Sequence, residues 1–241
     1  MSEMSEMSEM SQRRLRRGIR PGRRPLTCYH EAGHCLARWW FGHSFDRVLV
    51  LTTEQVVHNI RPVSQRGMPV MDTEGFMDGY DLKSSLTPDM LDGMGDEPDL
   101  VSQLRHVALV SVEMDLIENY IGAAAEARYR KCSAIAIMRT GGAGDLAQAG
   151  RTLNTWYSDP DARRTANIQA TQRAAALVRS EAGWRAIIAL ATTLLKHGEV
   201  QWNEAEPLLA AAYGHEQPNP NAWIAAWPPS LDMIRNGQLP K

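Results

Sequence analysis

The chain has 241 residues, of which 44% are hydrophobic and 22% charged, a composition typical of a globular protein with one sizeable core. No apolar run approaches the roughly 18 to 20 residues that cross a bilayer, and the first 24 residues lack the hydrophobic region of a signal peptide. Cys28, Cys35 and Cys132 have no spacing that indicates a disulfide framework. We therefore expect a cytoplasmic protein with reduced thiols and no transmembrane segment.

The net charge of -2 hides an uneven distribution. Residues 1–10 repeat Met-Ser-Glu, a composition that predicts disorder. The next segment, residues 13–24, contains no acid and is called the arginine arm below. It contains Arg13, Arg14, Arg16, Arg17, Arg20, Arg23 and Arg24. The arm could bind nucleic acid, an acidic lipid surface or an acidic partner, or it could be a solvated tail. No aromatic residue interleaves the arginines, which argues against single-strand binding.

Residues 27–40 contain the pattern His-Glu-x-x-His, with apolar residues at helical spacing and Thr27 as the predicted N-cap. Residues four apart lie on one face of an α-helix, so His30 and His34 would project side by side. Two imidazoles in this arrangement can share one zinc ion, and Glu31 beside them can act on a metal-bound water. The pattern therefore predicts a metal site on this helix.

The next segments predict a small sheet followed by a long insertion. Residues 46–53 are the best strand candidate; such a strand could be an edge that pairs with an extended peptide, or an ordinary buried strand. A second short strand is expected within residues 56–69. Residues 71–99 hold nine acids and one lysine and are interpreted as an acidic surface insertion with a short helix near residues 88–91. No calcium-loop spacing occurs there.

Residues 100–130 have a helical pattern, and the small residues at 122–127 would allow close helix packing. A further helix is expected to start near Asp145, which follows three glycines. The carboxylate of Asp145 could cap that helix, or it could be the missing zinc ligand. Two more helices are predicted within residues 167–209. Residues 214–241 are rich in proline and predict an extended tail that packs over the body or docks elsewhere.

Three segments in the same order resemble the peptidase domain of the FtsH-type ATP-dependent zinc proteases. They are YHEAGHCLARWWFGHSFDRVLVLT, IGAAAEARYRK and GGAGDLAQAGRTL, and the similarity extends over residues 25–213. The resemblance implies that Asp145 is the third zinc ligand. The chain lacks the Gly-x-x-x-x-Gly-Lys-Ser/Thr loop of an ATPase module, so it resembles the peptidase domain alone, and a separate unfoldase or adaptor is a candidate partner.

We thus expect a mainly α domain of the α+β class, with a small sheet or hairpin after the His-Glu-x-x-His helix. The predicted activity is that of a zinc metalloendopeptidase with Glu31 as general base and His30, His34 and Asp145 as ligands. The alternative is a non-catalytic binding or regulatory module stabilised by zinc. Glu126 is a rival third ligand or a partner of the ligands, and weaker rivals are His43, His58, His106, His197 and His215. No oxyanion-stabilising residue is assigned, although Tyr29 is a candidate.

Overall fold

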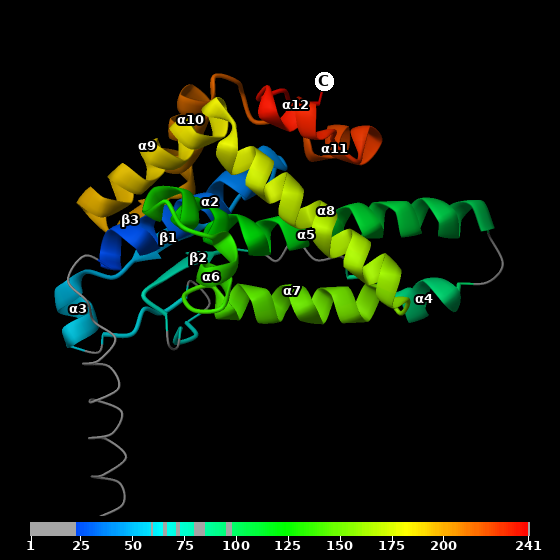
Figure 1. Cartoon of the computed structure of the whole chain (residues 1–241), viewed down its shortest axis with the longest axis horizontal. Coiled ribbons are helices and arrows are strands. Elements are labelled where there is room, and N and C mark those ends of the chain that lie inside the picture. Colours follow the sequence, from blue (N-terminus) through cyan, green and yellow to red (C-terminus); the bar gives the residue numbers. More distant parts are fainter. Residues whose placement is uncertain are drawn as a thin grey trace, which may run out of the picture.

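The computed structural model describes residues 23–58, 60–64, 67–70, 73–79, 85–94 and 98–240. Most of the arginine arm, and parts of the acidic insertion, lie outside these ranges. The described chain is mainly helical with one small antiparallel sheet (Figure 1), so the predicted fold class is confirmed. The helices are α2 (Arg23–Trp40), α3 (Thr53–Val57), α4 (Pro88–Asp92), α5 (Pro98–Arg130), α6 (Ala134–Met138), α7 (Ala143–Trp156), α8 (Pro160–Arg179), α9 (Glu181–His197), α10 (Trp202–Tyr213), α11 (Pro220–Ala226) and α12 (Leu231–Arg235).

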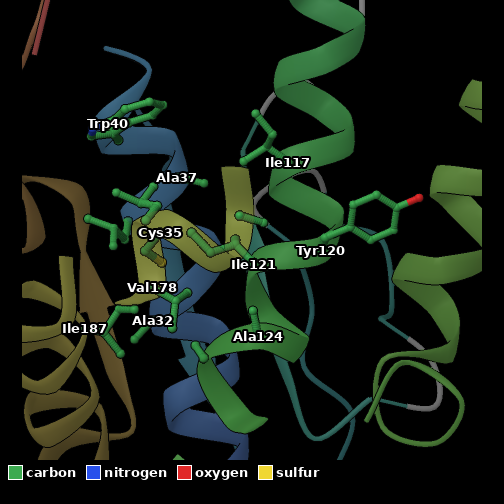
Figure 2. Packing of buried hydrophobic residues seen from close by; sticks show 14 of the residues in the cluster. Ala32, Cys35, Ala37, Trp40, Ile117, Tyr120, Ile121, Ala124, Val178 and Ile187 are labelled. Atoms are coloured by element: carbon green, nitrogen blue, oxygen red, sulfur yellow. The ribbon is translucent and has the colours of Figure 1, made fainter. Parts of the chain in front are cut away.

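The centre of the fold is the packing of α2 against α5. Figure 2 shows buried side chains of both helices meeting, with Cys35 and Ala37 on α2 facing Ile121 on α5. Small residues allow the two backbones to approach closely. A Cβ added at Gly33 would lie 2.9 Å from the backbone oxygen of Ile121 and 3.1 Å from the Cβ of Ala125. The predicted close packing of the small-residue segment is therefore confirmed, and its partner is the His-Glu-x-x-His helix.

The sheet has the order β2-β1-β3 and is antiparallel throughout. Its strands are β1 (Arg47–Val50), β2 (Gly75–Asp78) and β3 (Glu199–Gln201). The predicted strand in residues 46–53 is confirmed as β1, but it lies in the centre with both edges paired. Within the described residues, the segment 56–69 holds a single isolated bridge, between Val63 and Pro69. The second strand lies later, in the segment that we expected to be mostly surface loop.

The helices after the site differ from the prediction in number. Residues 160–213 form α8, α9 and α10 rather than two helices. The break between α8 and α9 is at Ser180, whose hydroxyl accepts a hydrogen bond from the backbone N–H of Gly183 and so caps α9. This cap is part of an otherwise continuous apolar pattern, so hydrophobic periodicity alone does not separate the two helices.

The C-terminal segment forms two short helices, α11 and α12, instead of an extended tail. Of the two, α12 packs against α8, and Figure 1 shows α11 next to α12. The indole of Trp223, fully buried, donates a hydrogen bond of 2.6 Å to the backbone oxygen of Trp40, and the two indole rings are 4.1 Å apart. This contact anchors the C-terminal end of α2, the helix that carries the histidines.

The start of α2 also differs from the prediction. The helix begins at Arg23, so Thr27 lies inside it rather than at its N-cap. Its end is followed by Gly42 with φ of +80°, where an added Cβ would lie 2.4 Å from the backbone oxygen of Pro218. Among the described residues, no helix combines the length and apolar character that a bilayer crossing requires.

Candidate metal centre

Three of the predicted site residues meet although they are far apart in sequence. His30 and His34 come from α2, and Asp145 comes from the first turn of α7. The Nε2 atom of His30 is 2.9 Å from Oδ2 of Asp145, and that of His34 is 3.5 Å from the same oxygen. One ligand atom from each residue lies within 4.8 Å of the others. The structure therefore brings together the three residues that the sequence predicts as ligands.

Asp145 makes no capping hydrogen bond in α7, because Gly142 is the N-cap residue and no side chain caps that end. Its carboxylate points instead to the two histidines. Of the three glycines before it, Gly142 is in ordinary contact with the site, since an added Cβ would lie 3.6 Å from Cε1 of His30. A Cβ at Gly144 would meet nothing within 4 Å. At these glycines, a side chain would therefore meet at most ordinary van der Waals contacts.

The second nitrogen of each histidine fixes how the ring is oriented. The Nδ1 atom of His34 is 2.8 Å from the backbone oxygen of Glu118. A carbonyl oxygen can only accept, so Nδ1 of His34 must carry the hydrogen. The Nδ1 atom of His30 is 3.5 Å from Oε2 of Glu126, and a carboxylate likewise accepts. In the neutral rings, both Nε2 lone pairs therefore face the centre of the site.

This arrangement fits a divalent metal ion. Two imidazole lone pairs and the carboxylate of Asp145 converge, and three acceptors at these distances need a cation or protons between them. Space is available on the α5 side because residue 122 is glycine. A Cβ at Gly122 would lie 2.4 Å from Nε2 of His34 and 2.7 Å from Nε2 of His30. Imidazole with carboxylate suits zinc, and it also suits iron, nickel and copper.

The electrostatics of the metal-free site show the same need for positive charge. Burial alone would lower the pKa of His30, but hydrogen bonds to Asp145 and Glu126 outweigh it and raise the pKa to about 10. Burial also opposes the charge on His34, yet Asp145 raises its pKa. The two histidines in turn hold the pKa of Asp145 far below its ordinary value, despite burial. The site therefore holds protons where a metal ion would supply the charge.

Glu31 lies beside this centre on the wall of a cavity of about 810 Å³, called the cleft below. The two histidines and Asp145 also line the cleft, and so does β2. A Cβ added at Gly75, the first residue of β2, would lie 3.0 Å from Oε1 of Glu31. Glu31 is 7% exposed, and its burial raises the pKa of its carboxyl group. A raised pKa suits a group that must take up and release a proton near neutrality.

Two glutamates of α5 support the histidines, Glu118 through its backbone oxygen and Glu126 through its carboxylate, and the side chain of each is held by an arginine. Glu126 bonds to Arg130 at 3.0 Å, and His30 and Arg130 together lower its pKa despite partial burial. Glu118 bonds through its side chain to Arg38 at 2.9 Å. Glu126 is therefore placed as a partner of a ligand, as the sequence analysis allowed. Sequence reasoning missed Glu118, Arg38 and the role of Gly122.

The remaining candidates lie elsewhere. The ring of Tyr29 stacks on Tyr129 and Trp184, at centroid distances of 4.1 and 5.5 Å, and does not line the cleft. The rival ligands His43, His58, His106, His197 and His215 fall outside the metal-ligating group that the described residues form. For example, the ring of His106 is 3.1 Å from the backbone oxygen of Ile224.

Comparison with models of known protein families gives no match, and a search of curated proteins gives none either. The geometry of the site therefore carries the functional argument, and the resemblance to the FtsH-type peptidases stays a prediction.

Proposed function

We propose that this chain is a zinc-dependent endopeptidase that hydrolyses peptide bonds in protein substrates. The observation that carries the proposal is the convergence of His30, His34 and Asp145 beside Glu31 in an open cleft. Three protein ligands leave a fourth position free, which is typical of catalytic rather than structural zinc. When bound there, zinc lowers the pKa of a water to about 7 and polarises a carbonyl oxygen.

Glu31 supplies the proton transfer in this proposal. Its carboxylate takes the proton of the attacking water and delivers it to the leaving amine. Burial raises its pKa, so the carboxyl group gives up the proton less readily to bulk water than an exposed glutamate does. Gly75 of β2 lies against this side chain and limits its movement. Glu118 and Glu126 keep the two rings oriented through their Nδ1 atoms.

The substrate backbone is proposed to lie along β2. Both edges of β1 are paired, with β2 and with β3, so β1 cannot accept a further strand. Among the described residues, β2 pairs with β1 alone and also lines the cleft next to Glu31. An extended peptide can pair with such an edge through its backbone. Phe76 and Met77 of the same strand line the cleft and would contact substrate side chains.

The experiment combines metal analysis with cleavage of casein. The purified chain should contain about one zinc per molecule, and Glu31→Gln should retain it because Glu31 is not a ligand. Cleavage should fall by about 10²- to 10⁴-fold, the usual contribution of a general base. Glu54→Gln, on the exposed surface of α3, is the matched control and should cleave normally.

Undiminished cleavage by Glu31→Gln would refute the mechanism. Bound zinc without hydrolysis of casein or a peptide library, together with a large loss of stability on chelation, would favour the non-catalytic binding module instead. We also propose that the enzyme acts in the cytoplasm, because Cys28, Cys35 and Cys132 are all free thiols and reduced thiols are typical of that compartment.

A further inference from the structure

The cleft has α2 as its floor and two different walls. On one side, a Cβ added at Gly75 of β2 would lie 2.7 Å from Cγ2 of Thr27 and 3.0 Å from Oε1 of Glu31. On the other side, α5 packs against Gly33, where an added Cβ would lie 2.9 Å from the backbone oxygen of Ile121. Residues 31 and 33 are about 200° apart around a helix, so β2 and α5 flank the histidines from opposite sides. A substrate strand on β2 therefore faces α5 across the cleft.

Helix α7 extends the wall that α5 begins, and two contacts fix how these helices align. At one end, Asp145 of α7 and Gly122 of α5 both face the Nε2 atoms of the histidines. Seven residues further along α7, the hydroxyl of Thr152 donates a buried hydrogen bond of 2.7 Å to the carboxylate of Asp115. Asp115 lies seven residues before Gly122, so the helices are antiparallel and stay in register over two turns. Figure 1 shows α7 running alongside α5.

Two amide side chains occupy the layer between these contacts. Asn119 lies on α5 between Asp115 and Gly122, and Gln148 lies on α7 three residues after Asp145. Both side chains line the cleft, and both residues are half-buried. The register puts them in one layer, about 5 Å along the helix axes from the proposed metal centre. The two residues are called the amide pair below.

The existing hydrogen bonds of the amide pair determine which of its atoms stay available. Nδ2 of Asn119 donates to the backbone oxygen of Asp115 at 2.7 Å, which uses one of its two hydrogens. Oε1 of Gln148 accepts from the guanidinium of Arg151 at 2.6 Å, which leaves both hydrogens of its amide nitrogen. Within the described part of the chain, these three N–H groups have no partner. The amide pair therefore offers hydrogen-bond donors on the wall opposite β2.

Donors on this wall suit the backbone of an extended peptide. Successive carbonyl groups of a strand point to alternate sides, so a peptide paired with β2 turns every second carbonyl oxygen away from it. Those oxygens point toward α5 and α7 and can accept hydrogen bonds. This part of the wall lies on the His34 side of the metal centre, because Nδ1 of His34 contacts the backbone oxygen of Glu118.

We propose that Asn119 and Gln148 bind the substrate by donating hydrogen bonds to its backbone carbonyl oxygens, on the His34 side of the scissile bond. The substrate chain is then held from both walls, by β2 along one edge and by the amide pair along the other. Because a backbone carbonyl is the same in every residue, this contact tolerates many substrate sequences. Its place beside a scissile bond rests on the proposed function, whereas the binding of an extended chain does not.

The test measures binding of fluorescein-labelled casein by fluorescence anisotropy. All proteins are full-length, loaded with zinc, and carry Glu31→Gln so that casein is not cleaved. Asn119→Leu and Gln148→Met remove the amide donors and keep a similar side-chain shape. Asn154→Leu, on the exposed surface of α7 and outside the cleft, is the matched control. Competition with a zinc-binding dye measures the metal affinity of each variant.

Each substitution in the amide pair should weaken casein binding by about 2- to 10-fold, the net contribution of a typical hydrogen bond. The double variant should lose more than either single variant. The control should bind casein as the parent does, and zinc affinity should stay the same in every protein. Unchanged casein binding by both single variants, an equal loss in the control, a parallel loss of zinc affinity, or no binding by the parent would overturn the proposal.

The same substitutions with Glu31 restored separate this proposal from the peptidase assignment. The variants should raise KM for casein and leave kcat nearly unchanged, because the lost contact holds the ground state and the transition state equally. If the wild-type chain cleaves no casein but the variants lose binding as described, the peptidase function fails while the binding role stands. If the variants cleave and bind casein as the wild type does, the binding role fails while the peptidase function stands.

Discussion

Gly122→Ala is the sharpest perturbation of the proposed metal site, because it adds a single methyl group and changes none of the proposed ligands. The residue lies in α5, opposite the two histidines, and its missing side chain leaves the space into which both Nε2 atoms point. Alanine favours a helix over glycine by about 0.5 to 1 kcal/mol. The substitution should therefore leave α5 helical while damaging the site.

The size of the effect follows from the contacts. The new Cβ would lie 2.4 Å from Nε2 of His34 and 2.7 Å from Nε2 of His30. Because non-bonded heavy atoms need roughly 3.4 to 4 Å, each ring must retreat by about 0.7 to 1 Å. Zinc sites tolerate ligand displacements of only about 0.2 Å. The dissociation constant for zinc should rise at least about 100-fold, which is about 2.7 kcal/mol.

The assay is a competition between the protein and a chelating dye for zinc, with circular dichroism to check the fold. Gly150→Ala, in the middle of α7, is the matched control because its Cβ would meet nothing within 4 Å. It should bind zinc normally and gain about 0.5 to 1 kcal/mol of stability. Wild-type zinc affinity in a folded Gly122→Ala protein would show that the metal does not lie between these histidines.

Three other changes test the surroundings of the site. Glu126→Gln should weaken zinc binding by about 10- to 100-fold in the same dye competition, because it removes the carboxylate that orients His30. In the metal-free protein, the pKa of His30 is raised to about 10, so its stabilising contribution is complete below pH 6.5 and is lost as the pH rises toward 10. Urea unfolding at several pH values should show that alkaline decline, and zinc should suppress it. Trp223→Ala should lower the free energy of unfolding by about 3 to 5 kcal/mol, and a urea midpoint near that of the wild type would contradict the anchoring of α2 by α11.

Local sequence predicts a helix correctly where the apolar periodicity and the helix-breaking residues indicate the same bounds. It fails where one of these two signals is missing. The pattern of residues 100–130 predicts α5 almost to its observed bounds, Pro98–Arg130. The division of residues 160–197 at Ser180 was missed because a serine cap interrupts no apolar periodicity. β2 was missed because only four residues pair, within a segment dominated by acids, glycine and proline. Its stability comes from pairing with β1, which is a tertiary effect.

At the site, the residues that belong to a motif of known spacing can be predicted from the sequence. Those that belong to no such motif are missed. The four-residue spacing of His30 and His34 predicts a metal-binding helix from sequence alone. Asp145 is 111 positions beyond His34, so it was identified by its resemblance to a family motif, and the structure then places it beside both rings. No comparable rule identifies Glu118, whose contribution is a backbone oxygen, because every residue has one.

The missed groups nevertheless share a pattern on α5. Glu118, Gly122 and Glu126 are spaced four residues apart, so they lie along one face of the helix. Glu118 accepts the Nδ1 hydrogen of His34, Gly122 leaves room for both Nε2 atoms, and the carboxylate of Glu126 faces Nδ1 of His30. Three successive turns on one face of α5 thus contact the two histidines. This explains why the segment has small residues at its contact with α2 and charged residues on either side of them. The features of α5 that meet the two histidines are therefore a glycine at 122 and a carboxylate four residues later at 126, because the oxygen from residue 118 belongs to the backbone.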